Sequence, residues 1–102
     1  MIEVYNKSIS LKKYKPITNY QNVIFKEKVN IDNITQFFLK FPEEKRGRKN
    51  FYSKEVMNTK TLLYNEIFKK AKTVKANCIA SIKEKIINDE VIITVSFYKK
   101  ND

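Results

Sequence analysis

The stretch that decides the fold runs from Tyr52 to Tyr98 and reads YSKEVMNTKTLLYNEIFKKAKTVKANCIASIKEKIINDEVIITVSFY. In its first half, apolar residues recur near every 3.6 positions, which is typical of an amphipathic helix that buries one face on a sheet. The residues of this stripe are Met57, Leu63, Ile67, Ala71 and Val74, flanked by Leu62 and Phe68. Ser53 can serve as the N-cap, so we expect one long helix over about residues 54–76.

The second half of the stretch alternates with a period of two, which predicts strands. The first run covers residues 78–87, and one of its sides carries Cys78, Ala80 and Ile82. The second run covers residues 91–98. One of its sides carries Val91, Ile93, Val95 and Phe97, and the other carries Ile92, Thr94, Ser96 and Tyr98. Asn88 and Asp89 between the runs are residues that favour tight turns. The chain therefore ends in an antiparallel hairpin, with Ile92 and Tyr98 opposite the main apolar face.

Three shorter segments before the long helix also predict strands. Residues 1–5 can form an edge strand or an arm that pairs only in an oligomer. Residues 8–15 alternate roughly, with Ile9 and Leu11 on the apolar side, until Pro16 ends the run. Residues 22–29 alternate more clearly. That last strand has Val23, Phe25 and Val29 on one side and Lys26 and Lys28 on the other.

Residues 30–41 change to a helical period, with Ile34, Phe37, Phe38 and Phe41 three and four positions apart before Pro42. They predict a short helix over about residues 33–41. The phenylalanines belong in the core, or alternatively form a ligand pocket or a subunit contact. The whole pattern predicts one α+β domain over residues 1–102, with an antiparallel sheet packed on the long helix.

The formal net charge is +10, and Arg46 and Arg48 are the only arginines among 21 basic residues. Such a lysine excess is typical of a solvated surface, or of a protein with an anionic partner. The run from Lys45 to Lys49 surrounds Gly47, the only glycine, and is the best candidate for phosphate binding. The alternative is a solvated loop.

The residue types argue against catalysis and against a metal or cofactor. The chain has no histidine, which is the commonest general base, and no glycine-rich phosphate loop. Cys78 is the only cysteine and falls on an alternating strand, where a buried thiol is usual. A metal site would need Cys78 repeated by symmetry, or convergence of distant carboxylates. With no apolar run near the roughly 20 residues that span a bilayer, we expect a cytoplasmic protein.

Gly47-Arg48, Tyr52 and Ala76-Asn77-Cys78-Ile79 resemble the corresponding segments of the YbjQ-like family, which is named for heavy-metal binding. That family has a Gly-Arg-Ser-x-x-Tyr-like segment, a helix, a Gly-Ala-Asn-Ala-Ile-like junction and a final hairpin. Lys75 replaces the family's glycine before Ala-Asn. The resemblance implies a small α+β subunit in a ring-like homopentamer, with residues 1–5 and one hairpin face as interface candidates.

These features lead to two functional hypotheses. The first is a non-enzymatic, homopentameric YbjQ-like protein that binds a small or anionic ligand at subunit junctions, with Arg48, Lys49, Tyr52 and Asn77 as site residues. The alternative is a basic nucleic-acid-binding or inhibitory module from a mobile element. That module would use Lys45, Arg46, Arg48 and Lys49, with tyrosines for stacking.

Overall fold

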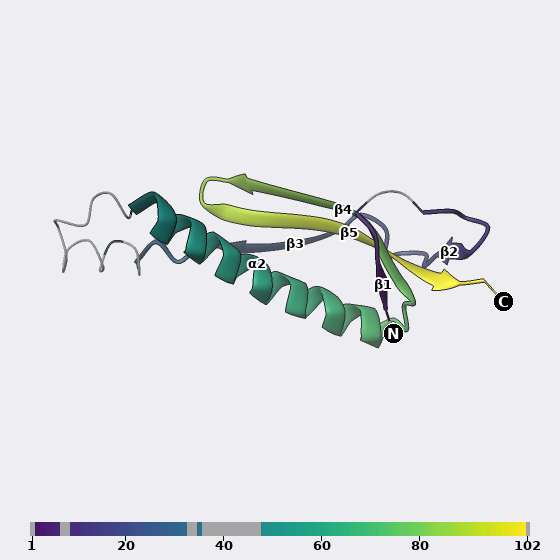
Figure 1. Ribbon diagram of the computed structural model, residues 1–102. Helices are drawn as coiled ribbons and strands as arrows, with labels where there is room; N and C mark the ends of the chain where they lie inside the picture. Colours follow the sequence, from purple (N-terminus) through teal and green to yellow (C-terminus); the bar gives the residue numbers. More distant parts are fainter. Residues whose placement is uncertain (1, 7–8, 33–34, 36–47, 102) are drawn as a thin grey trace.

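The structure is a computed structural model that describes residues 2–6, 9–32, 35 and 48–101. The described residues form the long helix α2 (Arg48–Thr73) and five strands (Figure 1). The strands are β1 (Glu3–Val4), β2 (Tyr14–Pro16), β3 (Val23–Lys28), β4 (Cys78–Ile87) and β5 (Glu90–Lys100). The α+β class is confirmed. The short helix expected at 33–41 falls, apart from Thr35, outside the described residues, as do Lys45, Arg46 and Gly47.

β5 is the centre of the sheet. β4 pairs with it antiparallel on one side, while β3 and β2 pair antiparallel on the other, β3 along residues 90–95 and β2 along residues 98–100. The last two strands are joined by Asn88 and Asp89, both at positive φ, as a two-residue type I′ hairpin requires. The predicted C-terminal hairpin is therefore confirmed.

The sheet is mixed, so the prediction of a fully antiparallel sheet is wrong in one place. β1 runs parallel to β4, with Glu3 opposite Cys78 and Val4 opposite Ile79. Two backbone bonds hold it there: Glu3 N–H donates to the Asn77 carbonyl at 3.0 Å, and Tyr5 N–H to the Ile79 carbonyl at 2.9 Å. The N-terminal segment thus pairs within its own chain.

α2 packs across one face of this sheet and buries the main core (Figure 1). From the helix the core takes Val56, Leu63, Ile67 and Ala71, and from β5 it takes Val91, Ile93, Val95 and Phe97. Each large side chain buried in this way contributes about 1.5–3 kcal/mol. The contact between α2 and β5 therefore supplies most of the main core in the described fold.

The helix starts earlier than its sequence predicts, and its stripe differs at one position: Leu63, Ile67 and Ala71 are buried as expected, but Met57 is not. Ser53 lies inside α2, which begins at Arg48, so Ser53 is not the N-cap. Met57 is 59% exposed, whereas Val56 and Thr59 are buried. The buried stripe follows Val56, Thr59 and Leu63, because these positions share the face that contacts β5 and β3.

Lys75 ends the helix in the left-handed region, at φ 59°. The Ala76 N–H donates to the Ala71 carbonyl at 2.8 Å, and the Lys75 N–H donates to the Lys72 carbonyl at 3.2 Å. These two bonds form a Schellman motif, in which glycine is the usual residue at the left-handed position. The helix end expected near residue 76 is close to the observed end at Thr73.

A bulge in β4 exchanges the two faces of that strand. The register shifts between Ala80 and Lys83, so that Ser81, at φ 56°, and Ile82 together oppose one residue of β5. Before the bulge, Cys78 and Ala80 lie on the face away from α2. After it, Ile82 packs into the helix-side core. The prediction that Cys78, Ala80 and Ile82 share one face is therefore wrong.

Within the expected strand at 8–15, residues 11–13 form a turn, and of the described residues only Tyr14–Pro16 pair with β5. Leu11 is accordingly 67% exposed. Tyr14 packs on Cys78 and Ala80, together with Tyr98, and covers the face opposite α2 at this end of the sheet. The rest of that face, toward the hairpin, is covered by no other described element.

Candidate functional site

The two strands that flank β5 carry the same three-residue motif, Lys-Glu-Lys, at residues 26–28 of β3 and 83–85 of β4. Because successive side chains on a strand point to opposite faces of the sheet, the glutamate points to one face and the two lysines point to the other. In both strands the glutamate faces α2, and the two lysines face away from it. The uncovered side of the sheet therefore carries Lys26, Lys28, Lys83 and Lys85, which we call the lysine face.

Strand pairing fixes how these lysines are arranged. Three cross-strand rows lie on this side: Ile24–Thr94–Lys83, Lys26–Ile92–Lys85 and Lys28–Glu90–Ile87. Neighbouring strands are about 4.8 Å apart, so the lysines of β3 and β4 are separated by about 10 Å. Ile92 and Thr94 of β5 lie between them, and we call these two residues the central strip.

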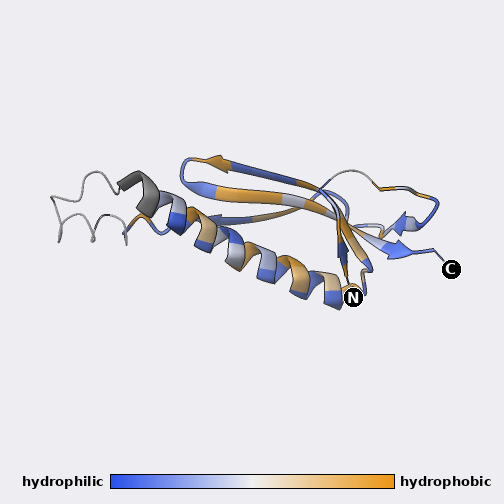
Figure 2. Ribbon diagram, viewed as in Figure 1, coloured by the Kyte–Doolittle hydropathy of each residue, from blue (hydrophilic) through white to orange (hydrophobic). Residues whose placement is uncertain are grey.

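The lysine face is exposed and lacks compensating charge. All four lysines are exposed, and none of them forms an ion pair with another described residue. Glu90, at the end near the turn, is the one acidic residue in the three rows. Ile24 is 63% exposed beside them. Figure 2 shows β4 as hydrophilic beyond its bulge and hydrophobic again at the hairpin.

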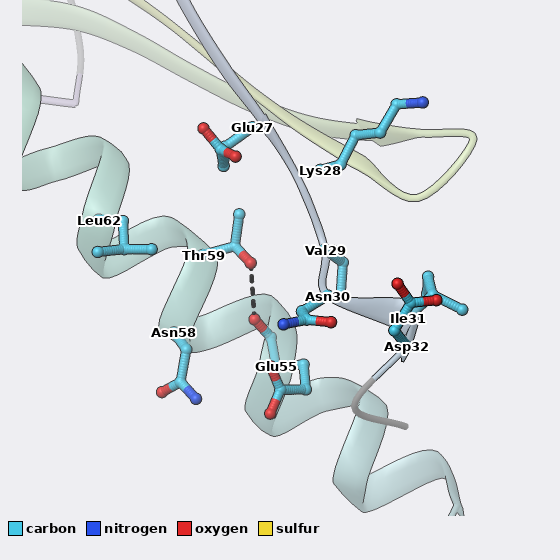
Figure 3. A pocket seen from close by; sticks show the side chains of 10 residues that line it. All are labelled: Glu27, Lys28, Val29, Asn30, Ile31, Asp32, Glu55, Asn58, Thr59 and Leu62. Carbon is cyan, nitrogen blue, oxygen red and sulfur yellow. Dashed lines mark hydrogen bonds between the residues drawn. The ribbon is translucent and has the colours of Figure 1, made fainter. Parts of the chain in front are cut away.

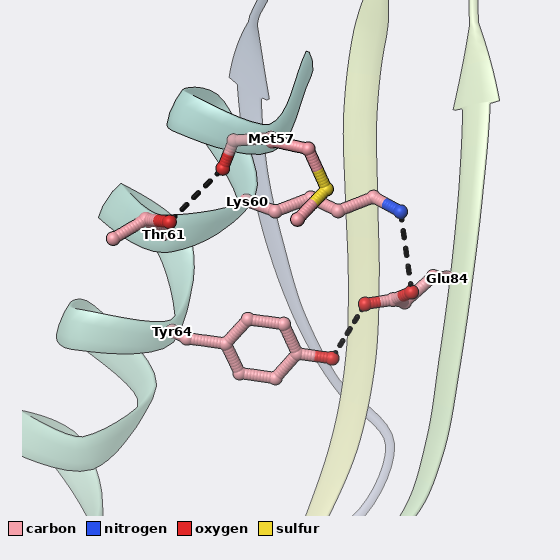
Figure 4. Close-up of polar contacts among 5 residues, drawn as sticks. All are labelled: Met57, Lys60, Thr61, Tyr64 and Glu84. Carbon is pink, nitrogen blue, oxygen red and sulfur yellow. Dashed lines mark hydrogen bonds and ion pairs between the residues drawn. The ribbon is translucent and has the colours of Figure 1, made fainter. Parts of the chain in front are cut away.

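The glutamate of the β4 motif is engaged on the other side of the sheet. Its carboxylate, from Glu84, accepts a hydrogen bond from the Tyr64 hydroxyl at 2.6 Å and pairs with the Lys60 amine at 3.4 Å (Figure 4). Burial, and then this hydrogen bond, raise the pKa of Tyr64. Glu84 therefore ties β4 to α2 and fixes the direction of the lysines beside it.

The glutamate of the β3 motif also faces the helix. Glu27 lines a cavity between β3 and α2, with Glu55, Asn58 and Thr59 on the helix side (Figure 3). The Thr59 hydroxyl donates to the Glu55 carbonyl at 2.8 Å, so it is already satisfied. The other lining residues are Lys28, Val29, Asn30, Ile31, Asp32 and Leu62. Within the described residues, no group of three acidic, cysteine or histidine side chains is arranged to hold a metal ion.

The residues predicted as a site lie at opposite ends of α2. Arg48, Lys49 and Tyr52 are in its first turns, and Asn77 follows its last. At about 1.5 Å per residue, the helix separates Tyr52 from its last residue, Thr73, by about 32 Å, and Asn77 lies beyond that end. The chain therefore brings Arg48, Lys49 and Tyr52 into one segment but does not join them to Asn77.

Both ends have their own contacts. The Tyr52 hydroxyl donates to Asp89 at 2.8 Å, and this bond raises the pKa of Tyr52 and ties the helix to the hairpin turn. The Asn77 side chain accepts the Lys100 backbone N–H at 2.9 Å. Asn77 also lines an open cavity at the end of α2, with Ile2, Phe68, Lys72, Lys75 and Ala76.

Cys78 is fully buried, as its position on a strand indicated. Burial, and then the nearby Glu3 carboxylate, raise the pKa of its thiol to about 11. Glu3 itself accepts hydrogen bonds from the hydroxyls of Tyr5 and Tyr14. A protonated, enclosed thiol is a poor nucleophile and a poor metal ligand.

The sequence predicts the basic run at residues 45–49 as the candidate site and not the lysine face, because the lysines of that face are spread over two segments far apart in the chain. The signal that could have found it is the repeated Lys-Glu-Lys in two strand-like segments. Across the described ranges, the structure contains no helix with the length and apolarity needed to cross a bilayer. Comparison of the chain with family models, curated proteins and solved structures found no match.

Proposed function

We propose that this protein is a non-enzymatic binding module for nucleic acid, and that the lysine face is its binding surface. One observation carries the proposal: four exposed lysines without ion pairs lie together on the side of the sheet that α2 leaves uncovered. A phosphate backbone that contacts such lysines releases condensed counterions, which favours binding. The lysine face is a different surface from the basic run at residues 45–49, but both would bind the same class of partner.

Charge argues against covering this surface with a second copy of the same surface. Two lysine faces brought together would oppose eight lysines to two copies of Glu90, at a separation where like charges repel. A polyanion has the opposite sign and gains from the same arrangement. The charge pattern therefore favours a phosphate-bearing partner.

Binding to a labelled 30-nucleotide single-stranded DNA, followed by fluorescence anisotropy, tests the proposal. We expect the double variant Lys26→Ala/Lys85→Ala to lose at least about tenfold in affinity at low salt. The matched control is Lys54→Ala/Lys69→Ala, which removes two exposed charges from α2. Equal losses in the two variants, or no binding by the native chain, would reject the lysine face as the site.

A second candidate is the homopentameric YbjQ-like protein, with a small or anionic ligand at its subunit junctions. Two observations favour it. Lys75, at φ 59°, stands where the family has glycine and adopts a conformation that glycine prefers. In addition, β1 covers only Cys78 and Ile79 of β4, so the outer edge of β4 after its bulge has no partner strand among the described residues. A free edge can pair with a neighbouring subunit.

Light scattering coupled to gel filtration at low and high salt tests this second candidate. A salt-independent mass of about five times 12.2 kDa would support it. A Pro substitution at Ile86, whose backbone N–H points to the free edge, should then reduce the mass, because proline removes a backbone donor. A monomer at both salt concentrations would contradict the pentamer and leave the nucleic-acid proposal unaffected.

A further inference from the structure

Resting on the proposed function, we propose that the lysine face selects single-stranded nucleic acid, with its phosphates bound by the lysines of both β3 and β4 and its bases over the central strip. The inference concerns the form of the ligand, since both single and double strands carry phosphates. Its basis is the arrangement of long charged side chains around short uncharged ones.

Long charged side chains border short uncharged ones on the lysine face. The lysines of β3 lie on one side and those of β4 on the other, about 10 Å away. Between them lies the central strip, and Ile24 of β3 lies beside its Thr94. We call these three residues the floor, and the floor with its bordering lysines the trough. Because a lysine side chain is longer than that of isoleucine or threonine, an elongated ligand can contact charge at the edges of the trough and apolar groups at its floor.

The trough has a closed end and an open end. Tyr14 and Tyr98 pack together over the face beyond Ser96, which limits the ligand on that side. The three cross-strand rows of the lysine face lie between Ser96 and the hairpin turn. They span about 14 Å along the strands, because alternate residues on a strand are about 6.8 Å apart. A single copy of the protein therefore contacts only a few nucleotides.

The floor distinguishes single strands from duplexes. In a duplex the base faces are stacked inside the helix, so they cannot cover Ile92 or the exposed Ile24. In a single strand the bases can turn away from the backbone and contact apolar side chains. A duplex could satisfy the lysines but would leave the isoleucines in water.

The same geometry argues against a lipid surface as the occupant. A flat anionic membrane would meet the lysine amines first, while the central strip stays below them and out of reach of the acyl region. Electrostatic attraction would remain, but the apolar floor would contribute nothing. A strand-shaped ligand uses both parts of the trough.

The test compares four probes at equal salt: a 12-nucleotide oligo(dT), an abasic 12-mer with the same phosphates, a 12-base-pair duplex, and vesicles of phosphatidylcholine with phosphatidylserine. We expect oligo(dT) to bind roughly tenfold tighter than the abasic strand, a gain that needs roughly 50–60 Å² of isoleucine surface to be covered by bases. The logarithm of the binding constant should fall with the logarithm of salt with a slope of about −2.8 for four lysine contacts.

Two variants separate the floor from the charge. Ile92→Ala and the more exposed Ile24→Ala should each reduce the advantage of oligo(dT) over the abasic strand and leave abasic affinity unchanged. One outcome would overturn this inference while the proposed function stands: oligo(dT), the abasic strand and the duplex bind the native chain equally, and all three bind the variant Lys26→Ala/Lys85→Ala more weakly. Tighter binding to the vesicles, or affinity for all probes unchanged in that double variant, would overturn both.

Discussion

Lys75 adopts a backbone conformation that its own residue type does not predict. A lysine carries no signal for a left-handed backbone, yet it stands where the YbjQ-like pattern has glycine, and its φ is 59°. Asn88 and Asp89 differ, because their types alone favour positive φ and predicted the turn correctly.

Replacing Lys75 with glycine should raise stability. Glycine has no Cβ to oppose the left-handed conformation, so we expect a gain of about 1 kcal/mol, equal to about 4–8 °C in melting temperature for a domain of this size. Thermal unfolding by circular dichroism measures it. Lys72→Gly, one turn earlier inside α2, is the control and should lower the melting temperature by a similar amount.

Tyr64 gives a prediction in pH. Its pKa is raised from 10.0, chiefly by burial and then by the bond to Glu84, so the folded state holds this proton more tightly than the unfolded state. Its contribution to stability is therefore complete below pH 10 and falls as pH rises above it. Urea unfolding at pH 8 and pH 11 should show a smaller loss for Tyr64→Phe than for the native chain. Equal losses would mean that Tyr64 does not carry the effect.

Among the elements, α2 and β5 were predicted best because both have long, regular periods. The face of α2 was assigned wrongly at Met57, since two adjacent apolar residues, Val56 and Met57, fit one stripe almost equally well. β1 could not be predicted as a parallel strand, because two backbone hydrogen bonds decide its place. The bulge at Ser81 was missed because serine is not the glycine that such a position favours.

The bulge at Ser81 gives a prediction about strand register. Ser81 and Ile82 together oppose Val95, so a chain without Ser81 can pair Ile82 with Val95 and keep every later residue of β4 opposite its present partner. We therefore expect the deletion variant to keep a cooperative thermal transition, with Glu84 still facing α2. Ser81→Gly keeps the bulge and should be at least as stable as the native chain, because glycine accepts φ 56°. Loss of the cooperative transition in the deletion variant would contradict the assigned register.

For the whole molecule, composition predicted the charge but not its location. Alternation in β3 and β4 separates negative from positive side chains: the glutamates face α2, and the lysines lie on the opposite side of the sheet. Neither strand reveals this alone, because the lysines come together only through pairing with β5. The candidate site was therefore outside what the sequence predicted, although the α+β class was within it.

Mutual repulsion within the lysine face should make the melting temperature depend on salt. Screening reduces the repulsion, so we expect the melting temperature to rise between 20 mM and 500 mM sodium chloride. Lys26→Ala/Lys85→Ala should show a smaller rise than Lys54→Ala/Lys69→Ala, which leaves the face intact. Identical salt dependence in the two variants would show that the four lysines do not interact.

The order of the strands along the chain has a kinetic consequence. α2, β4 and β5 are consecutive, so their contacts close short loops, whereas β3 joins β5 from the other end of the sequence. Local contacts form early and distant ones late, so we expect the helix and hairpin to assemble first and β3 to dock last. Because β3 supplies Lys26 and Lys28, the trough is completed only in the final step of folding, and a ligand that needs both rows of lysines recognises the finished protein and none of its precursors.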